Sequence, residues 1–139
     1  MIFTFNKKIY GYECDIYGHL NNAAYLQMLE AARSDALVEM DMPIAKLLQM
    51  EIQLFVLHYE LDYLKALDLE DRVCVKSWFY KANRIKGFWR QEVYNSAGEL
   101  CFVAAFTVVY ASQGKAKRLP IEVHRQFLKF LEADGGMDT

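Results

Sequence analysis

Hydrophobic periodicity divides the chain into one helical segment and several strand-like segments. From Ala23 to about Met40, apolar residues recur every three or four positions, and neither Gly nor Pro interrupts them. This pattern predicts one long helix, with Asn21 or Asn22 as its N-cap and Pro43 shortly after its end. The apolar face is wide, so we expect the rest of the domain to enclose most of the helix.

Runs of β-branched and aromatic residues predict strands on both sides of this helix. The expected strands are residues 2–10, 52–65, 72–81, 84–94 and 99–111. A turn at residues 95–98 joins the last two as a hairpin, which indicates an antiparallel sheet. A short helix is expected from Pro120, followed by a polar tail at residues 134–139. This order predicts an α+β fold in a single domain over residues 1–139.

Composition and charge narrow the classes of partner. The 139 residues are 54% hydrophobic, which is enough to form the core of one domain. A formal net charge of -2 argues against nucleic acid and anionic membranes as partners. The sequence shows no signal-peptide pattern and no apolar run near the roughly 20 residues of a membrane-spanning helix, so we expect a cytoplasmic protein. The cysteines and histidines follow no ligand spacing, and we expect neither disulfides nor a metal.

One segment carries a family resemblance. Residues 12–26, YECDIYGHLNNAAYL, with EAAR at residues 30–33, resemble the signature of the 4-hydroxybenzoyl-CoA thioesterase-like hot-dog family. Residues 62–65 and 69–73 also resemble this family, so the likeness spans nearly the whole chain. It implies a hot-dog fold, in which an antiparallel sheet of about five strands wraps around a long central helix. It further implies hydrolysis of acyl-CoA or acyl-carrier-protein thioesters at the interface of a homodimer or homotetramer, with CoA as part of the substrate and no separate cofactor.

The same resemblance assigns roles to residues within the motif. It places the catalytic carboxylate at Asp15 and the oxyanion donor at a backbone amide on or near Asn22. The first N–H groups of a helix lack intrahelical acceptors, and a nearby carboxylate can act as general base or nucleophile. Outside this motif, a loop aspartate more often only binds loop amides. His19 either orients the substrate or donates a hydrogen bond to the thioester carbonyl, or it has a structural role at the helix entry. Cys14 is interpreted as a small hydrophobe.

Cations at two predicted turns are candidates for binding the phosphates of CoA. Lys81, Arg84 and Lys86 surround the first turn, and we take Arg84 and Lys86 as the leading pair. The second group consists of Lys115, Lys117 and Arg118. Because charge at a turn usually only solvates an exposed edge, a purely structural role stays open for both groups.

Two other functions are compatible with the same pattern. One is a hot-dog hydratase or dehydratase, which also pairs a carboxylate with a histidine but acts on the acyl chain. The other is a non-catalytic acyl-CoA-binding domain, because a fold alone does not prove activity. Serine-hydrolase, nucleotide and dinucleotide chemistry is not indicated, since the sequence has no GxSxG, Walker-type or GxGxxG motif.

Overall fold

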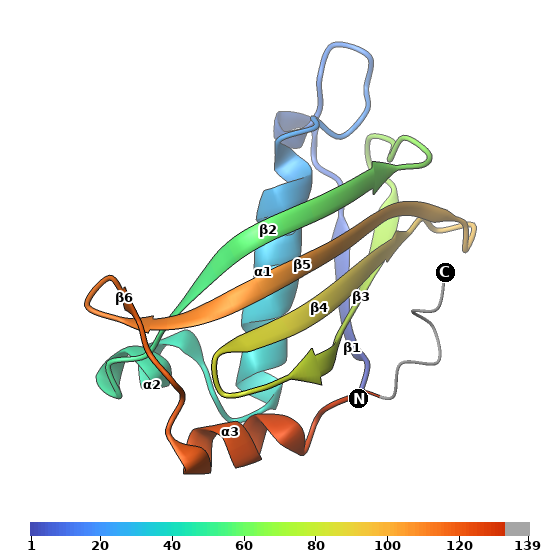
Figure 1. Cartoon of the computed structure of the whole chain (residues 1–139). Coiled ribbons are helices and arrows are strands. Elements are labelled where there is room, and N and C mark those ends of the chain that lie inside the picture. Colours follow the sequence, from blue (N-terminus) through green and yellow to red (C-terminus); the bar gives the residue numbers. More distant parts are fainter. Residues whose placement is uncertain (133–139) are drawn as a thin grey trace.

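One antiparallel sheet dominates the computed structural model, which describes residues 1–132 (Figure 1). Its strands are β1 (Phe3–Lys8), β2 (Gln53–Tyr63), β3 (Arg72–Ala82), β4 (Lys86–Tyr94), β5 (Leu100–Ser112) and β6 (Lys115–Ala116). The strand order is β1-β3-β4-β5-β2, with β6 paired to β5. The helices are η1 (Gly11–Glu13), α1 (Ala24–Glu39), α2 (Ile44–Gln49) and α3 (Ile121–Leu128). The predicted α+β fold and antiparallel sheet are confirmed, and the expected tail at residues 134–139 lies outside the described residues.

The core lies between α1 and the curved sheet that crosses over it in Figure 1. Side chains of β4 alternate in burial, and every second residue from Gly87 to Val93 is buried. From the helix side, Leu29, Ala32 and Ala36 are almost fully buried against this sheet. The two alanines allow a close approach of helix and sheet, which fixes where the start of α1 lies relative to the strands.

The long, enclosed central helix expected from the sequence is not confirmed. Helix α1 has 16 residues, and its Leu26 and Val38 side chains are 37% and 59% exposed. The sheet covers only one side of α1 within a single chain, so part of its wide apolar face stays open. In residues 1–132, no helix combines the length and apolar character needed to cross a membrane.

Strand β2 forms an edge of the sheet, because it pairs only with β5 among the described strands. The ladder shifts register between Val56 and His58, which marks a bulge near the middle of the strand. Around this bulge, Phe55, Val56 and Leu57 are exposed at 47%, 38% and 59%. An exposed apolar edge of this kind is a pairing surface unless something covers it.

Candidate active site

The loop that carries Asp15 is closed by its own backbone hydrogen bonds just ahead of α1. The Asp15 N–H donates to the His19 carbonyl at 2.9 Å, and the Gly18 N–H donates to the Asp15 carbonyl at 3.1 Å. Gly18 has a φ of 75°, a left-handed conformation that favours glycine at this turn. The Leu20 N–H donates to the Leu67 carbonyl at 2.8 Å, which ties the loop to the segment before β3. These bonds hold Asp15 in a defined place.

The Asp15 carboxylate organises the loop through one of its two oxygens. Its Oδ1 accepts the Tyr17 N–H at 2.9 Å and the His19 N–H at 3.3 Å. Within residues 1–132, no hydrogen bond to Asp15 Oδ2 is found. Asp15 therefore stabilises the loop through Oδ1, as a loop aspartate usually does. Its Oδ2 stays available for a ligand.

The start of α1 provides an unused backbone donor next to this loop. The predicted N-cap at Asn21 or Asn22 is wrong, because the residue that precedes α1 is Ala23 and no side chain of the described residues caps the helix. Asn21 instead closes the turn before the helix, where its Oδ1 accepts the Ala23 N–H at 3.0 Å and its carbonyl accepts the Ala24 N–H at 2.8 Å. The Asn22 N–H donates to no acceptor in the described part of the chain. From the sheet side, the Tyr63 hydroxyl donates to the Asn22 carbonyl at 3.2 Å. Tyr63 thus helps to fix the orientation of this peptide.

An open cavity of about 430 Å³ brings the three predicted site residues together. Its lining consists of Asp15, His19, Leu20, Asn22, Tyr25, Tyr63, Leu64, Lys65 and Ala66. The His19 imidazole lies 3.6 Å from the Asp68 carboxylate, measured from Nε2 to Oδ1, and contacts Asp15 only through the His19 backbone. Asp15 and the Asn22 amide therefore line the same cavity, while the His19 side chain lies against Asp68.

Tyr63 and Lys65 line this cavity and were not among the candidates from sequence. The Tyr63 ring lies 5.1 Å from the Tyr25 ring and 4.8 Å from the Phe102 ring, measured between centroids. Lys65 is paired with Glu99 at 2.7 Å, which raises the pKa of the lysine and lowers that of the acid. Only their place in the motif at residues 62–65 could have indicated them, since the Tyr63–Asn22 contact spans 41 residues of sequence.

The Cys14 thiol next to Asp15 is poorly suited to act as a nucleophile. The Cys14 thiol donates to the Tyr10 carbonyl at 3.5 Å, and burial together with the Asp15 carboxylate raises its pKa. A raised pKa disfavours the thiolate, which is the nucleophilic form. Over residues 1–132, no group of His, Cys, Asp and Glu side chains is arranged to hold a metal ion.

The candidate phosphate-binding cations lie at the far end of the sheet from Asp15. Arg84 and Lys86 flank the β3–β4 turn, whereas the Asp15 loop lies near the start of β3, an 11-residue strand roughly 35 Å long. Arg84 is partly buried, and its Nε donates to the Leu119 carbonyl at 2.8 Å. A single chain therefore does not bring these cations to the Asp15 cavity.

Known proteins resemble this chain in sequence and in structure. A long-chain acyl-CoA thioesterase, FadM of Escherichia coli strain K12, is 29% identical over 83% of this chain and 87% of its own length. The crystal structure of YbaW, a probable thioesterase from Escherichia coli, has a TM-score of 0.81 and 26% identity, covering 94% of this chain and 99% of that one. A Staphylococcus aureus protein solved in complex with CoA has a TM-score of 0.86 at 16% identity, covering 96% and 87%. A model of the thioesterase-like superfamily matches residues 11–128, and the chain therefore belongs to this superfamily.

Proposed function

We propose that this protein is a thioesterase that hydrolyses acyl-CoA thioesters to a free acid and CoA, with Asp15 as general base or nucleophile. Membership of the thioesterase-like superfamily supports the reaction class. The long-chain acyl-CoA thioesterase among its relatives supports CoA as the thiol part of the substrate. An acyl-carrier-protein thioester is the alternative with the same reacting bond.

The observation that carries this proposal is the pairing of Asp15 with the Asn22 amide across one open cavity. A thioester carbonyl bound there meets the Asn22 N–H, which has no acceptor among residues 1–132. An N–H at the start of a helix also carries the positive end of the helix dipole. It can stabilise the negative charge that develops on the carbonyl oxygen.

Two routes use the same pair of groups. As a base, Asp15 takes a proton from water while the water oxygen attacks the carbonyl carbon, and the tetrahedral intermediate then expels the CoA thiolate, which recovers the proton. As a nucleophile, Asp15 attacks the carbonyl carbon itself and expels the CoA thiolate, which leaves a mixed anhydride. Water then hydrolyses the anhydride to the free acid and the Asp15 carboxylate, and the proton released protonates the thiolate. His19 is a helper at most in either route, because its side chain lies against Asp68.

The purified protein is expected to release thiol from acyl-CoAs, as measured with a thiol reagent over a panel of straight-chain and aromatic acyl groups. Acyl-carrier-protein thioesters with the same acyl groups form the second arm of the panel. Addition of water to an enoyl-CoA without thiol release would identify a hydratase instead. Saturable acyl-CoA binding with no turnover of any substrate would contradict the proposal and identify a binding domain.

We further propose that the protein works as a homodimer, or as a tetramer of such dimers, through the exposed edge of β2. The apolar residues Phe55 and Leu57 lie on that edge. Antiparallel pairing of two β2 strands brings the Phe55 end of one copy beside the Tyr63 end of the other. Within one copy, Phe55 pairs with Val109 and Val109 pairs with Lys86, so the β3–β4 turn lies at the Phe55 end of the sheet. In the paired arrangement this turn is therefore on the same side as the second copy's Asp15 loop. It supports a role of Arg84 and Lys86 in binding CoA phosphates across the interface.

Phe55→Glu is expected to convert the assembly to monomers, since each copy would then place a carboxylate against the other copy at an apolar contact. Sedimentation velocity measures this directly, and thiol release is expected to fall together with the assembly. Ile121→Glu is the matched control, because Ile121 is similarly exposed but belongs to α3 and not to the β2 edge. A wild-type protein that sediments as a monomer and is fully active would refute the two-copy site.

A further inference from the structure

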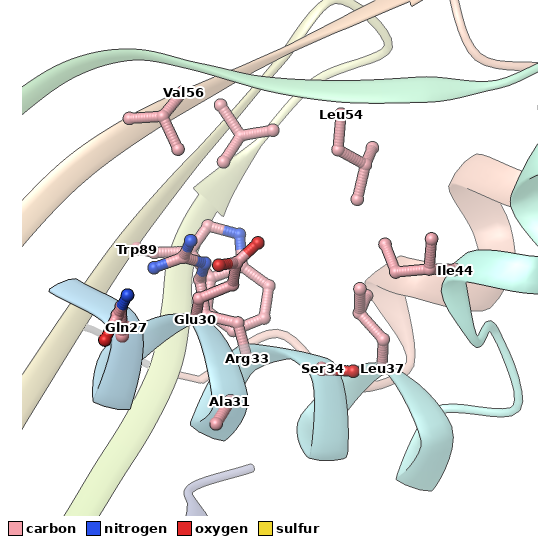
Figure 2. A pocket seen from close by; sticks show the side chains of 11 residues that line it. Gln27, Glu30, Ala31, Arg33, Ser34, Leu37, Ile44, Leu54, Val56 and Trp89 are labelled. Carbon is pink, nitrogen blue, oxygen red and sulfur yellow. The ribbon is translucent and has the colours of Figure 1, made fainter.

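A second groove runs along α1, beside the exposed edge strand. It has a volume of about 390 Å³ and lies between α1 and the inner side of β2, with Trp89 of β4 and Val108 of β5 behind it. Figure 2 shows side chains from α1 pointing into this space, with Leu54 and Val56 of β2 opposite them. Its size and mainly apolar walls suit a small organic group such as an acyl chain.

The groove also contains one partly buried cation, Arg33. Its Nη1 donates to the Tyr59 hydroxyl at 2.7 Å and to Gln91 Oε1 at 3.4 Å. In the part of the chain that the structure describes, Arg33 forms no ion pair, and no hydrogen bond from its Nη2 or Nε is found. Glu30 lines the same groove without pairing with it. Of the five N–H donors of a guanidinium, three remain for a ligand.

Keeping the Arg33 cation partly buried is unfavourable in free energy. Removing a charge from water is unfavourable unless a counter-ion or hydrogen bonds compensate it. The faces of the Phe106 and Tyr59 rings, 4.9 Å and 6.0 Å from the guanidinium carbon, provide part of that compensation. Gln91, which is fully buried, is itself fixed by donating to the Leu29 carbonyl and to Ser77 Oγ. Arg33 is therefore a pre-oriented donor, as recognition requires.

The groove and the Asp15 cavity both lie between α1 and β2, because Tyr25 and Tyr63 line the cavity and residues of the same two elements line the groove. Leu26, Glu30 and Arg33 follow each other at spacings of four and three residues, so they share one side of α1, and Asn22 lies in the turn just before the helix. Asn22 and Arg33 are 11 positions apart, which is roughly 16 Å along a helix axis. An extended chain advances about 3.5 Å for every three bonds, so roughly 14 bonds span this distance.

We propose that the groove holds the acyl chain and that Arg33 hydrogen-bonds an oxygen atom near its far end. The preferred substrates are then CoA thioesters of acyl chains with about 10 to 14 carbons that carry a terminal hydroxyl or carboxyl group. A plain alkyl end displaces water from the Arg33 donors without offering them an acceptor, which penalises the plain chain. This inference rests on the proposed thioesterase function and specifies its substrate class.

The test compares three CoA thioesters of equal length: dodecanoyl, 12-hydroxydodecanoyl and the mono-thioester of dodecanedioic acid. Wild type is expected to hydrolyse at least one oxygenated substrate with a kcat/KM about tenfold or more above that of dodecanoyl-CoA. Arg33→Met is expected to remove this preference, so that the ratio of kcat/KM for the oxygenated substrate to that for dodecanoyl-CoA falls to about one, through a higher KM for the oxygenated substrate. Arg125→Met on α3 is the control with the same substitution outside the groove.

Equal or lower efficiency of wild type on both oxygenated substrates would overturn the inference, and so would an equal loss on all three substrates in Arg33→Met. If Arg33→Met does not fold, product inhibition of wild type decides. Dodecanedioic or 12-hydroxydodecanoic acid must then inhibit more strongly than dodecanoic acid, and the reverse order refutes the role of Arg33. No thiol release from any of the three thioesters or from the wider panel would instead refute the thioesterase proposal itself.

Discussion

Replacing Asp15 with asparagine is expected to lower kcat/KM for acyl-CoA hydrolysis by about 100- to 10,000-fold, the usual contribution of a positioned base. Asparagine keeps a side-chain oxygen that can accept the Tyr17 and His19 N–H groups, so the loop is expected to stay intact. It cannot take a proton from water or form a mixed anhydride. Rates of thiol release, with circular dichroism as a check on folding, measure the effect.

Asp15→Ala separates the chemical role of this residue from its structural role. Alanine removes both the carboxylate and the two loop hydrogen bonds, so its loss should equal or exceed that of Asp15→Asn. If Asp15 only shapes the loop, Asp15→Asn would remain active and only Asp15→Ala would fail. Asp35→Asn is the matched control, since Asp35 is an exposed aspartate within α1. Wild-type rates in both Asp15 variants would remove this residue from the mechanism.

Phe102→Ala is expected to destabilise the fold by about 3–5 kcal/mol. Phe102 is fully buried, and its ring centroid lies 4.5 Å from that of Tyr25 and 4.8 Å from that of Tyr63. The truncation leaves a cavity between the sheet and the start of α1 that these rings cannot fill without moving. Urea denaturation followed by tryptophan fluorescence measures the change in unfolding free energy.

Tyr12→Ala provides the comparison for this prediction, because the Tyr12 side chain is 86% exposed. Its expected cost is about 1 kcal/mol or less. A similar midpoint for both variants would show that the aromatic cluster around Phe102 contributes little to stability. A selective loss in Phe102→Ala would show that the ring packed against Tyr25 and Tyr63, which line the Asp15 cavity, is part of the stabilising core.

The strands were predictable from the sequence to within a few residues, for a local reason. Alternating burial in β4 and the turn at residues 95–98 are properties of short stretches, and the structure has both. Helix α2 and strand β6 were missed. Pro43 marks the end of one helix as clearly as the start of another, and six- and two-residue elements are too short for a periodic pattern.

The enclosure of α1 was overestimated because apolar residues such as Leu26 and Val38 were counted as core. Composition cannot show which side of a helix a sheet covers. The site residues likewise fall into a local group, which the sequence predicted, and a distant group, which it did not. Asp15, His19 and Asn22 are neighbours in sequence and share one cavity, whereas Tyr63 and Gln91 join their partners from strands far along the chain.

The hydrogen-bonded loop around Asp15 has a consequence for how such proteins diversify. The loop closes on itself and on Leu67, while the groove at Arg33 is built from α1, β2, β4 and β5. Substitutions at Leu54, Val56 or Val108 can therefore reshape the groove without moving the carboxylate. Exchanging these positions offers a way to engineer acyl selectivity while the reaction centre stays untouched.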